Sequence, residues 1–225
     1  EKPVHLIITF IPGTSTDIVA RIVFQKVSEL WGQPVVPENR AGAGGAIGTA
    51  AVANAPADGY TLLVDSSAHS VSPSIYAKLP YDTFKDFVDV APLTVQPNIL
   101  VVPASSPYKT LMDMVNAAKA KPGVLNIGHA GVGSGTHLNT ERFIAATGIA
   151  ITQIPFKGSP DVIAAILNGS IDAYWAPISA AIPQLKAGKL RPLAASTAKR
   201  NPRLPDVPTT EIGRASCRAR VLDGV

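Results

Sequence analysis

The sequence is poor in the residues from which disulfides and metal centres are built. Cys217 is the single cysteine among 225 residues, which excludes an internal disulfide framework and a cysteine metal cluster. The four histidines, His5, His69, His129 and His137, include no pair at the i, i+4 spacing of a helical zinc site. We therefore expect neither a metal nor a cofactor.

Long apolar runs are also missing. No stretch reaches the roughly 18–20 residues that a membrane-spanning helix needs. The chain begins at Glu1 without a leader segment, so we expect a targeting peptide to have been removed or to lie outside this sequence. The formal net charge is only +4, and no aromatic residues are interleaved with its basic clusters, which argues against nucleic-acid binding.

Short β-type runs alternate with helical patterns along almost the whole chain. Strand-like runs lie at 4–10, 35–36, 60–65, 89–102, 125–130, 151–155, 171–175 and 193–197. Helical patterns lie at 17–31, 46–54, 110–120, 136–146, 161–167 and 179–187. This alternation predicts an α/β fold with parallel sheets and crossover helices.

The first helix, 17–31, carries an apolar stripe that we expect to be its buried face. The stripe consists of Ile18, Ile22, Val23, Val27 and Leu30. The extended segment 89–103 is interrupted by three prolines, which suits a chain that leaves one sheet and enters another. A second crossing is expected near 193–199. Two α/β lobes joined in this way form a hinge, with a ligand cleft at the carboxyl ends of the strands.

The turn after the first strand is the most informative local feature. Pro12 and Gly13 lead through three hydroxyl residues to Asp17 at the start of a helix. Free backbone N–H groups and the positive end of the helix dipole make such a turn an anion seat. Asp17 itself has two open roles: it meets a ligand ammonium or hydroxyl, or it only complements the dipole in the first helical turn.

Two glycine-rich stretches fail the motifs for nucleotide chemistry or catalysis. In 40–48 the third glycine falls one position beyond G-x-G-x-x-G. The stretch 131–137 lacks the Gly-Lys-Ser/Thr ending of a P-loop, and Val132 and Thr136 occupy the glycine positions of a nucleophile elbow. Its bare amides and hydroxyls suit a carboxylate; the alternative is a tight turn with Ser and Thr as helix caps.

The histidines show no sequence pattern of a catalytic site. His69 and His137 are expected on loops after strands, where a ligand can meet them. No nucleophile–base–orienter pattern accompanies them. Because the promising loops offer anion-binding backbone without a nucleophile and its base, the sequence favours a binding protein over an enzyme.

An ordered series of short segments carries a family resemblance. It includes Phe10-Ile11-Pro12-Gly13, Thr16-Asp17-Ile18-Val19-Ala20-Arg21, Glu38-Asn39-Arg40-Ala41-Gly42-Ala43-Gly44-Gly45, Phe156-Lys157-Gly158-Ser159 and Leu204-Pro205-Asp206-Val207-Pro208-Thr209. Over about residues 1–210 the chain resembles the Bug-type solute-binding proteins of tripartite tricarboxylate transporters, the TctC-like family.

The resemblance implies a periplasmic protein with the two-lobed type II periplasmic-binding-protein fold. Such a protein is expected to be a monomer that captures a small mono- or dicarboxylate, an aromatic acid or an amino acid, performs no chemistry on it, and hands it to membrane permease subunits. The implied lobes are 1–98 and 99–196, with 197–210 returning to the first lobe.

The family's ligand loops map onto this sequence position by position. The implied ligand-binding residues are Phe10, Pro12, Gly13, Thr14, Ser15, Thr16, Asp17, Ser66, Ser67, His69, Gly133, Ser134, Gly135, Thr136, His137, Phe156, Lys157, Gly158 and Asp172.

The chain departs from the family pattern at two places. Thr14 replaces a usual glycine, which is expected to add a Cβ and a hydroxyl near the ligand. Residues 211–225 do not resemble the family's continuation, in which further elements complete the first lobe. We expect this tail to be foreign to the family, to pack poorly, and to follow a C-terminal truncation.

Two other functions stay open. One is a carboxylate sensor that docks onto a signalling partner. The other is an enzyme acting on carboxylic acids, which needs His69 and His137 close to each other and to a hydroxyl or carboxylate partner.

Overall fold

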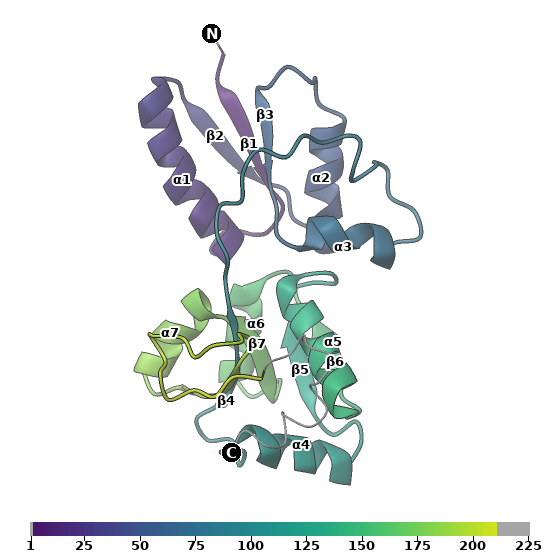
Figure 1. Cartoon of the computed structure of the whole chain (residues 1–225), viewed down its shortest axis with the longest axis vertical. Helices are drawn as coiled ribbons and strands as arrows, with labels where there is room; N and C mark the ends of the chain where they lie inside the picture. The colour runs from purple at the N-terminus through teal and green to yellow at the C-terminus, as the bar shows by residue number, and fades with distance from the viewer. Residues whose placement is uncertain (1, 211–225) are drawn as a thin grey trace. The chain divides into compact units, whose positions relative to one another are not determined.

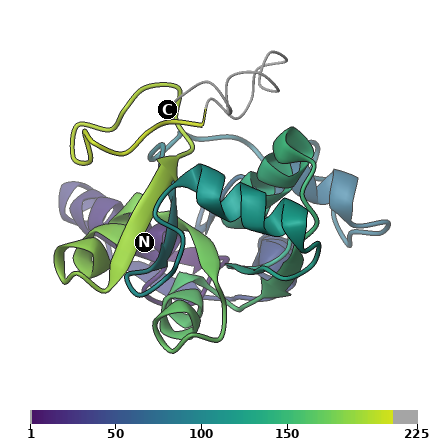
Figure 2. The same ribbon diagram turned by 90° about the horizontal axis from the view of Figure 1, so that it is seen from below.

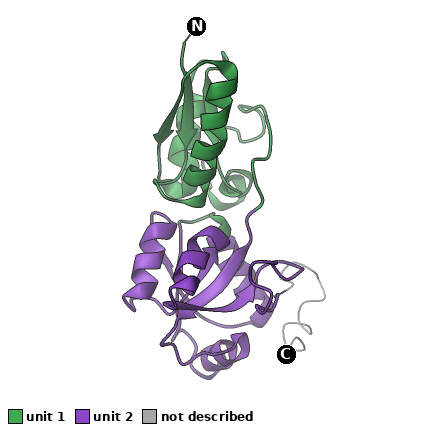
Figure 3. Ribbon diagram, turned by 90° about the vertical axis from the view of Figure 1, so that its left-hand side faces the viewer, with its two compact units in different colours: residues 1–95, 131–135 green, residues 96–130, 136–225 purple. Residues whose placement is uncertain are grey.

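The computed structural model describes residues 2–210 (Figure 1). The chain forms two compact units (Figure 3). Unit 1 comprises residues up to 95 together with 131–135, and unit 2 comprises 96–130 and the residues from 136 onwards. The predicted α/β class is confirmed, and the chain passes from one unit to the other within the proline-interrupted segment 89–103, at residue 95 rather than 98.

Unit 1 is a small parallel sheet with its crossover helices (Figure 1). Its elements are β1(Val4–Ile8), α1(Ser15–Trp31), β2(Val35–Asn39), the 3-10 turn η1(Ala43–Gly45), α2(Ala46–Ala53), β3(Thr61–Val64) and α3(Ala68–Ile75). The strand order is β2-β1-β3. In the parallel register Ile8 lies opposite both Asn39 and Val64. The three strands therefore end at one edge, where the loops that follow them meet.

The core of unit 1 lies between this sheet and α1. Leu6, Ile8 and Val64 from the strands pack with Ala20 and Phe24 of α1. The contact face of the helix thus runs through positions 17, 20 and 24, which are one helical turn apart.

The stripe predicted as the buried face of α1 is wrong at three of its five positions. Ile18, Ile22 and Leu30 are 44%, 65% and 74% exposed. Hydrophobic periodicity finds an apolar side of a helix, but small Ala20 lets the neighbouring side approach the sheet more closely.

Unit 2 is a five-stranded mixed sheet. Its elements are β4(Asn98–Pro103), α4(Leu111–Ala120), β5(Asn126–His129), α5(Gly135–Thr147), β6(Thr152–Pro155), α6(Ser159–Leu167), β7(Ala173–Pro177), α7(Ile178–Lys186) and β8(Leu190–Ala195). The strand order is β6-β5-β7-β4-β8. β5 runs parallel to β6 and β7, whereas β4 is antiparallel to β7 and β8.

Helices cover both faces of this sheet. Tyr174 of β7 packs on one face with residues of α6 and α7 such as Val162 and Ala181. The next residue, Trp175, packs on the other face with Met114 of α4 and Phe143 of α5. Because side chains alternate across a strand, a strand buried on both faces is apolar throughout, as β7 is.

One helix was missed by sequence reasoning. Residues 66–72 were expected as a loop, but Ala68–Ile75 form α3, so His69 lies on a helix. Serine and an internal proline, Pro73, favour a loop locally. Burial of Ala68 and Ser72 against the rest of unit 1 outweighs that preference, and Ser72 Oγ donates to Ala68 O at 2.7 Å.

The expected return of residues 197–210 to the first lobe is not what the structure has. These residues belong to unit 2, where they loop out beyond the end of β8 and return to its last residue (Figure 2). The amide of Ala195 donates to Pro208 O at 2.7 Å, and the amide of Thr210 donates to Ala195 O at 2.9 Å. Val207 is buried in the core of unit 2, which gives the segment its anchor. The predicted packing of the tail 211–225 lies outside the described residues.

Candidate functional site

The turn between β1 and α1 is built by two residues with different backbone requirements. Gly13 has φ 81°, a left-handed conformation that favours glycine. Thr14 is extended, with φ −72° and ψ 161°, and is the N-cap of α1. A residue with a Cβ fits at position 14, so the backbone does not need the family's glycine there.

The side chain of Thr14 is turned into the turn itself. Its Oγ1 donates to Ile11 O at 2.9 Å and accepts from the amide of Asp17 at 3.4 Å. Thr14 is 4% exposed. The hydroxyl that was expected near the ligand is therefore used as a helix cap.

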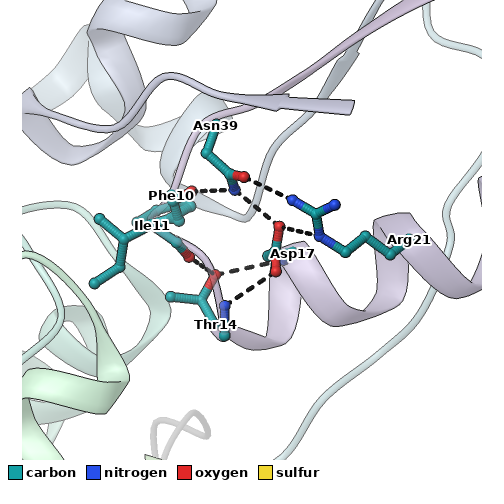
Figure 4. Close-up of polar contacts among 7 residues, drawn as sticks. Phe10, Ile11, Thr14, Asp17, Arg21 and Asn39 are labelled. Carbon is teal, nitrogen blue, oxygen red and sulfur yellow. Dashed lines mark hydrogen bonds and ion pairs between the residues drawn. The ribbon is translucent and has the colours of Figure 1, made fainter. Parts of the chain in front are cut away.

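Asp17 is the centre of a hydrogen-bond network (Figure 4). Its Oδ2 accepts from the amide of Gly13 at 3.0 Å. Its Oδ1 accepts from Arg21 Nε at 2.9 Å and from Asn39 Nδ2 at 2.8 Å. The carboxylate is almost fully buried, and both oxygens are occupied within the protein. Of its two open roles, the structure supports the internal one.

The ionised form of Asp17 is stabilised by these partners. Burial by itself raises the pKa of a carboxyl, but the hydrogen bonds from Asn39, Gly13 and Arg21, with the Arg21 charge, outweigh it and hold the pKa of Asp17 below its usual range. A charged carboxylate therefore fastens the turn at neutral pH.

Two amides in the first turn of α1 stay available. Thr14 N–H donates to Ile11 O, and Asp17 N–H is capped by Thr14. The amides of Ser15 and Thr16 have no hydrogen-bond acceptor within residues 2–210. Since these are first-turn donors, they suit an anion. Pro12 is exposed beside them, whereas Phe10 is buried.

A second buried carboxylate, Asp65, directly follows the end of β3 in unit 1. Asp65 Oδ1 accepts from Thr9 Oγ1 and from the amide of Ser66, both at 2.7 Å, and Oδ2 accepts from Thr49 Oγ1 at 3.1 Å. Burial raises the pKa of Asp65 despite these bonds. Asp65 thus connects Thr9, which follows β1, to Thr49 of α2.

The other predicted residues of this loop lie around Asp65. Ser66 Oγ accepts from the amide of Ala68 at 3.1 Å, and Ser67 O accepts from Ser70 Oγ at 3.0 Å. His69 Nδ1 lies 3.9 Å from Asp65 Oδ2, and its ring meets Phe87 edge-on with centroids 4.9 Å apart. His69 is therefore directed into unit 1 by two contacts.

In unit 2 a buried tyrosine joins the first turns of two helices. Tyr174 Oη donates to Ser159 Oγ in α6 at 2.8 Å, and Thr136 in α5 interacts with the same hydroxyl. Thr136 Oγ1 also accepts from the amide of Ala130 at 2.9 Å. Burial raises the pKa of Tyr174 well above its usual range, so it acts as a neutral donor.

The predicted residues at the β6–α6 junction connect the end of β6 to the start of α6. Phe156 N–H donates to His129 O at 2.9 Å, and its ring packs on the core of unit 2. Lys157 is exposed and Gly158 is the N-cap of α6. Gly133, Ser134 and Gly135 belong to the segment grouped with unit 1, where Ser134 N–H donates to Gly131 O at 3.2 Å.

His137 stands in a different environment from His69. Its ring is tilted against that of His129 with centroids 4.5 Å apart, and its Nε2 lies 3.5 Å from Glu141 Oε1. His69 belongs to unit 1 and His137 to unit 2. Each histidine therefore has its own carboxylate neighbour within its own unit.

Asp172 lies at the opposite end of its sheet from these loops. It comes directly before β7, and its Oδ2 accepts from the amide of Asn126 at the start of β5 at 2.8 Å. β5 and β7 are parallel, so the loop after His129 lies at the other edge. We leave Asp172 out of the ligand-binding set.

Sequence reasoning missed Asn39 and Arg21 as parts of the β1–α1 turn. A signal was present, since Asn39 ends a strand that pairs with β1. The residues from 2 to 210 contain no group of three or more His, Cys, Asp or Glu side chains suited to a metal ion. Nor do they contain a helix long and apolar enough to cross a membrane.

Comparison with known proteins places these features in a family. The family model "Tripartite tricarboxylate transporter family receptor", TctC, matches residues 19–222. That match continues through most of the stretch 211–225 that we expected to be foreign. Protein BugT of Bordetella pertussis is 39% identical over 94% of this chain, and the chain spans just under two thirds of BugT, 66%.

Two solved structures are similar in sequence and fold. "R. palustris Rpa4515 with adipate" has 36% identity and a TM-score of 0.89, covering 96% of this chain and 73% of that one. "MatC (Rpa3494) from Rhodopseudomonas palustris with bound malate" has 32% identity and a TM-score of 0.87, covering 94% and 73%. The periplasmic-binding-protein fold is thereby confirmed. The glycine turn and the capped helix start lie where the family motifs are, and the family model matches most of the chain. This chain therefore belongs to the tripartite tricarboxylate transporter receptor family.

Proposed function

We propose that this protein is a periplasmic solute-binding protein that captures a small carboxylate, performs no chemistry on it and delivers it to the permease of a tripartite transporter. Membership of the receptor family supports this function. The similar proteins whose structures hold adipate and malate support a carboxylate as the ligand. We draw the ligand-binding residues from the loops that follow β1, β3, β5 and β6.

The observation that carries the proposal is the pair of amides at Ser15 and Thr16. They lie in the first turn of a 17-residue helix, at the carboxyl end of β1, without an acceptor within residues 2–210. A carboxylate is an acceptor only, so it matches two parallel N–H donors. The helix dipole adds a favourable field for its charge.

The side chains nearby support an acid without a required amine. The only carboxylate in the turn, Asp17, is buried and bonded to Gly13, Arg21 and Asn39. A ligand ammonium group would need an acceptor, and both oxygens of Asp17 already accept hydrogen bonds within the protein. We therefore favour dicarboxylates over amino acids as ligands.

The test removes one amide and keeps the helix. Ser15 is the first helical residue, a position that tolerates proline, and the extended conformation of Thr14 suits a residue that precedes proline. Ser15→Pro deletes the N–H, and Ser15→Ala is the matched control that deletes only the hydroxyl.

Binding is measured by thermal shift and calorimetry against adipate, malate and the diamide of adipate. We expect the two acids to raise the melting temperature and the uncharged diamide to leave it unchanged. Ser15→Pro should weaken acid binding about ten- to hundredfold, since a hydrogen bond to a charged group contributes about 1.5–3 kcal/mol. If no acid in a wider panel binds, the proposal fails.

A further inference from the structure

We propose that Asn39 is a positioning residue that keeps the anion seat of α1 open by holding Asp17 away from it. This inference rests on the proposed function, because it concerns the amides of Ser15 and Thr16. Asn39 itself is not expected to touch the ligand.

Asn39 uses its whole side-chain amide to connect three separate parts of unit 1 (Figure 4). It is the last residue of β2 and lies opposite Ile8 of β1. Its Nδ2 donates to Phe10 O and to Asp17 Oδ1, both at 2.8 Å, and its Oδ1 accepts from Arg21 Nη2 at 2.8 Å. The bonds tie the strand end to the first two turns of the helix.

This combination of contacts requires an amide of this length. A carboxylate at position 39 would lose both donors and would place a second negative charge against Asp17. An alanine would remove all three bonds. Asparagine supplies two donors and one acceptor in one plane, which matches the three partners.

Holding Asp17 matters because it is an anion close to the seat. It is the third residue of α1, a position from which a carboxylate reaches back past the helix start, and its charge lies in the same first turn as the free amides. In the structure Asn39 and Arg21 take Oδ1, and the Gly13 amide takes Oδ2. If Asn39 is lost, we expect Asp17 to turn toward Ser15 and Thr16 and to compete with the ligand.

If Asp17 competes with the ligand in the absence of Asn39, removing the Asp17 charge should restore binding. A purely structural role of Asn39 does not predict this. Asn39→Ala should weaken adipate and malate binding at least tenfold. Adding Asp17→Asn to Asn39→Ala removes the competing charge and should restore at least part of the lost affinity. If Asn39 only stabilised the fold, the double variant would bind no better than the single one. Asn54→Ala is the control, since the side chain of Asn54 donates to Ala50 O of its own helix end, and it should leave affinity unchanged.

A second measurement needs no ligand. Hydrogen exchange and the carboxyl chemical shift report on the Gly13 amide and on Asp17 in the isolated protein. In Asn39→Ala the Gly13 amide should exchange faster, and the carboxyl chemical shift of Asp17 should change because its hydrogen-bond partners change. If Asn39→Ala does not fold, Asn39→Ser, which keeps a hydroxyl at the strand end, is measured in the same way.

The outcomes separate the two proposals. If wild-type protein binds no acid but Asn39→Ala shifts Asp17 as described, the function is wrong and the positioning role stands. If wild type binds acids, and Asn39→Ala binds them equally well or the double variant recovers nothing, the positioning role is overturned and the function stands.

Discussion

Tyr174 of β7 donates its hydroxyl to Ser159 in the first turn of α6, with an oxygen–oxygen distance of 2.8 Å. Both residues are buried, and Tyr174 is completely shielded from solvent. Seated in the middle of the sheet of unit 2, Tyr174 fixes where α6 begins and, through Thr136, where α5 begins.

Tyr174→Phe should destabilise unit 2 by about 1–3 kcal/mol, because it leaves the buried Ser159 hydroxyl without its donor. Urea denaturation measures the change. Tyr60→Phe is the control, since Tyr60 lies at the exposed surface of unit 1 and should change the free energy of unfolding by less than about 0.5 kcal/mol. Equal effects from the two variants would contradict the role given to Tyr174.

Thr14→Ala should lower stability by about 1 kcal/mol through loss of the helix cap. Thr14→Ser keeps the hydroxyl that bonds Ile11 O and the Asp17 amide, so it should retain most of that stability. Thermal unfolding compares the two. Thr14→Ser removes only the γ-methyl group and should keep acid affinity within about twofold; a large loss would show that this methyl group contacts the ligand.

Gly128→Ala should destabilise unit 2 by about 1–3 kcal/mol through overpacking. A Cβ at Gly128 would lie 2.6 Å from Ile171 Cδ1 and 2.7 Å from Val162 Cγ1, whereas a Cβ at Gly188 would have no atom within 4 Å. Gly188→Ala therefore tests backbone strain without crowding. Combining Gly128→Ala with Val162→Ala should recover part of the loss if crowding is its cause.

The two buried aspartates of unit 1 should give opposite pH dependences. The pKa of Asp17 is lowered on folding, so its contribution is complete above its unfolded pKa of about 3.9 and is lost as the pH falls through the lower folded value. The pKa of Asp65 is raised by burial, so its ionisation costs stability as the pH rises from about 3.9 through the higher folded value.

Asp17→Asn and Asp65→Asn make this measurable against the wild type. The stability difference between wild type and Asp17→Asn should shrink as the pH falls from 5 to 3. The stability of the wild type relative to Asp65→Asn should fall as the pH rises over the range in which Asp65 ionises. Parallel curves for either variant would show that the carboxyl does not titrate as described.

The fold class followed from the chain pattern because alternating strands and helices have few ways to pack. The helix predicted at 161–167 is α6, which begins two residues earlier, at Ser159, with Pro160 in its first turn. α3 escaped prediction because Pro73 and the serines disfavour a helix locally, and only burial of Ala68 and Ser72 offsets them. The exposed positions Ile18 and Ile22 show the same limit for helix faces.

The proposed anion seat after β1 could be predicted from the order of residues along the chain. A helix that starts after a strand leaves first-turn amides without helical acceptors. The sequence placed that start at Asp17, and the structure places it at Ser15. Which side chains surround this turn depends on the tertiary structure. Asn39 meets Asp17 because parallel pairing sets β2 opposite β1, and Asp172 leaves the set because the same pairing rule puts it at the far edge of its sheet. Such contacts depend on strand register, which neighbouring residues do not encode.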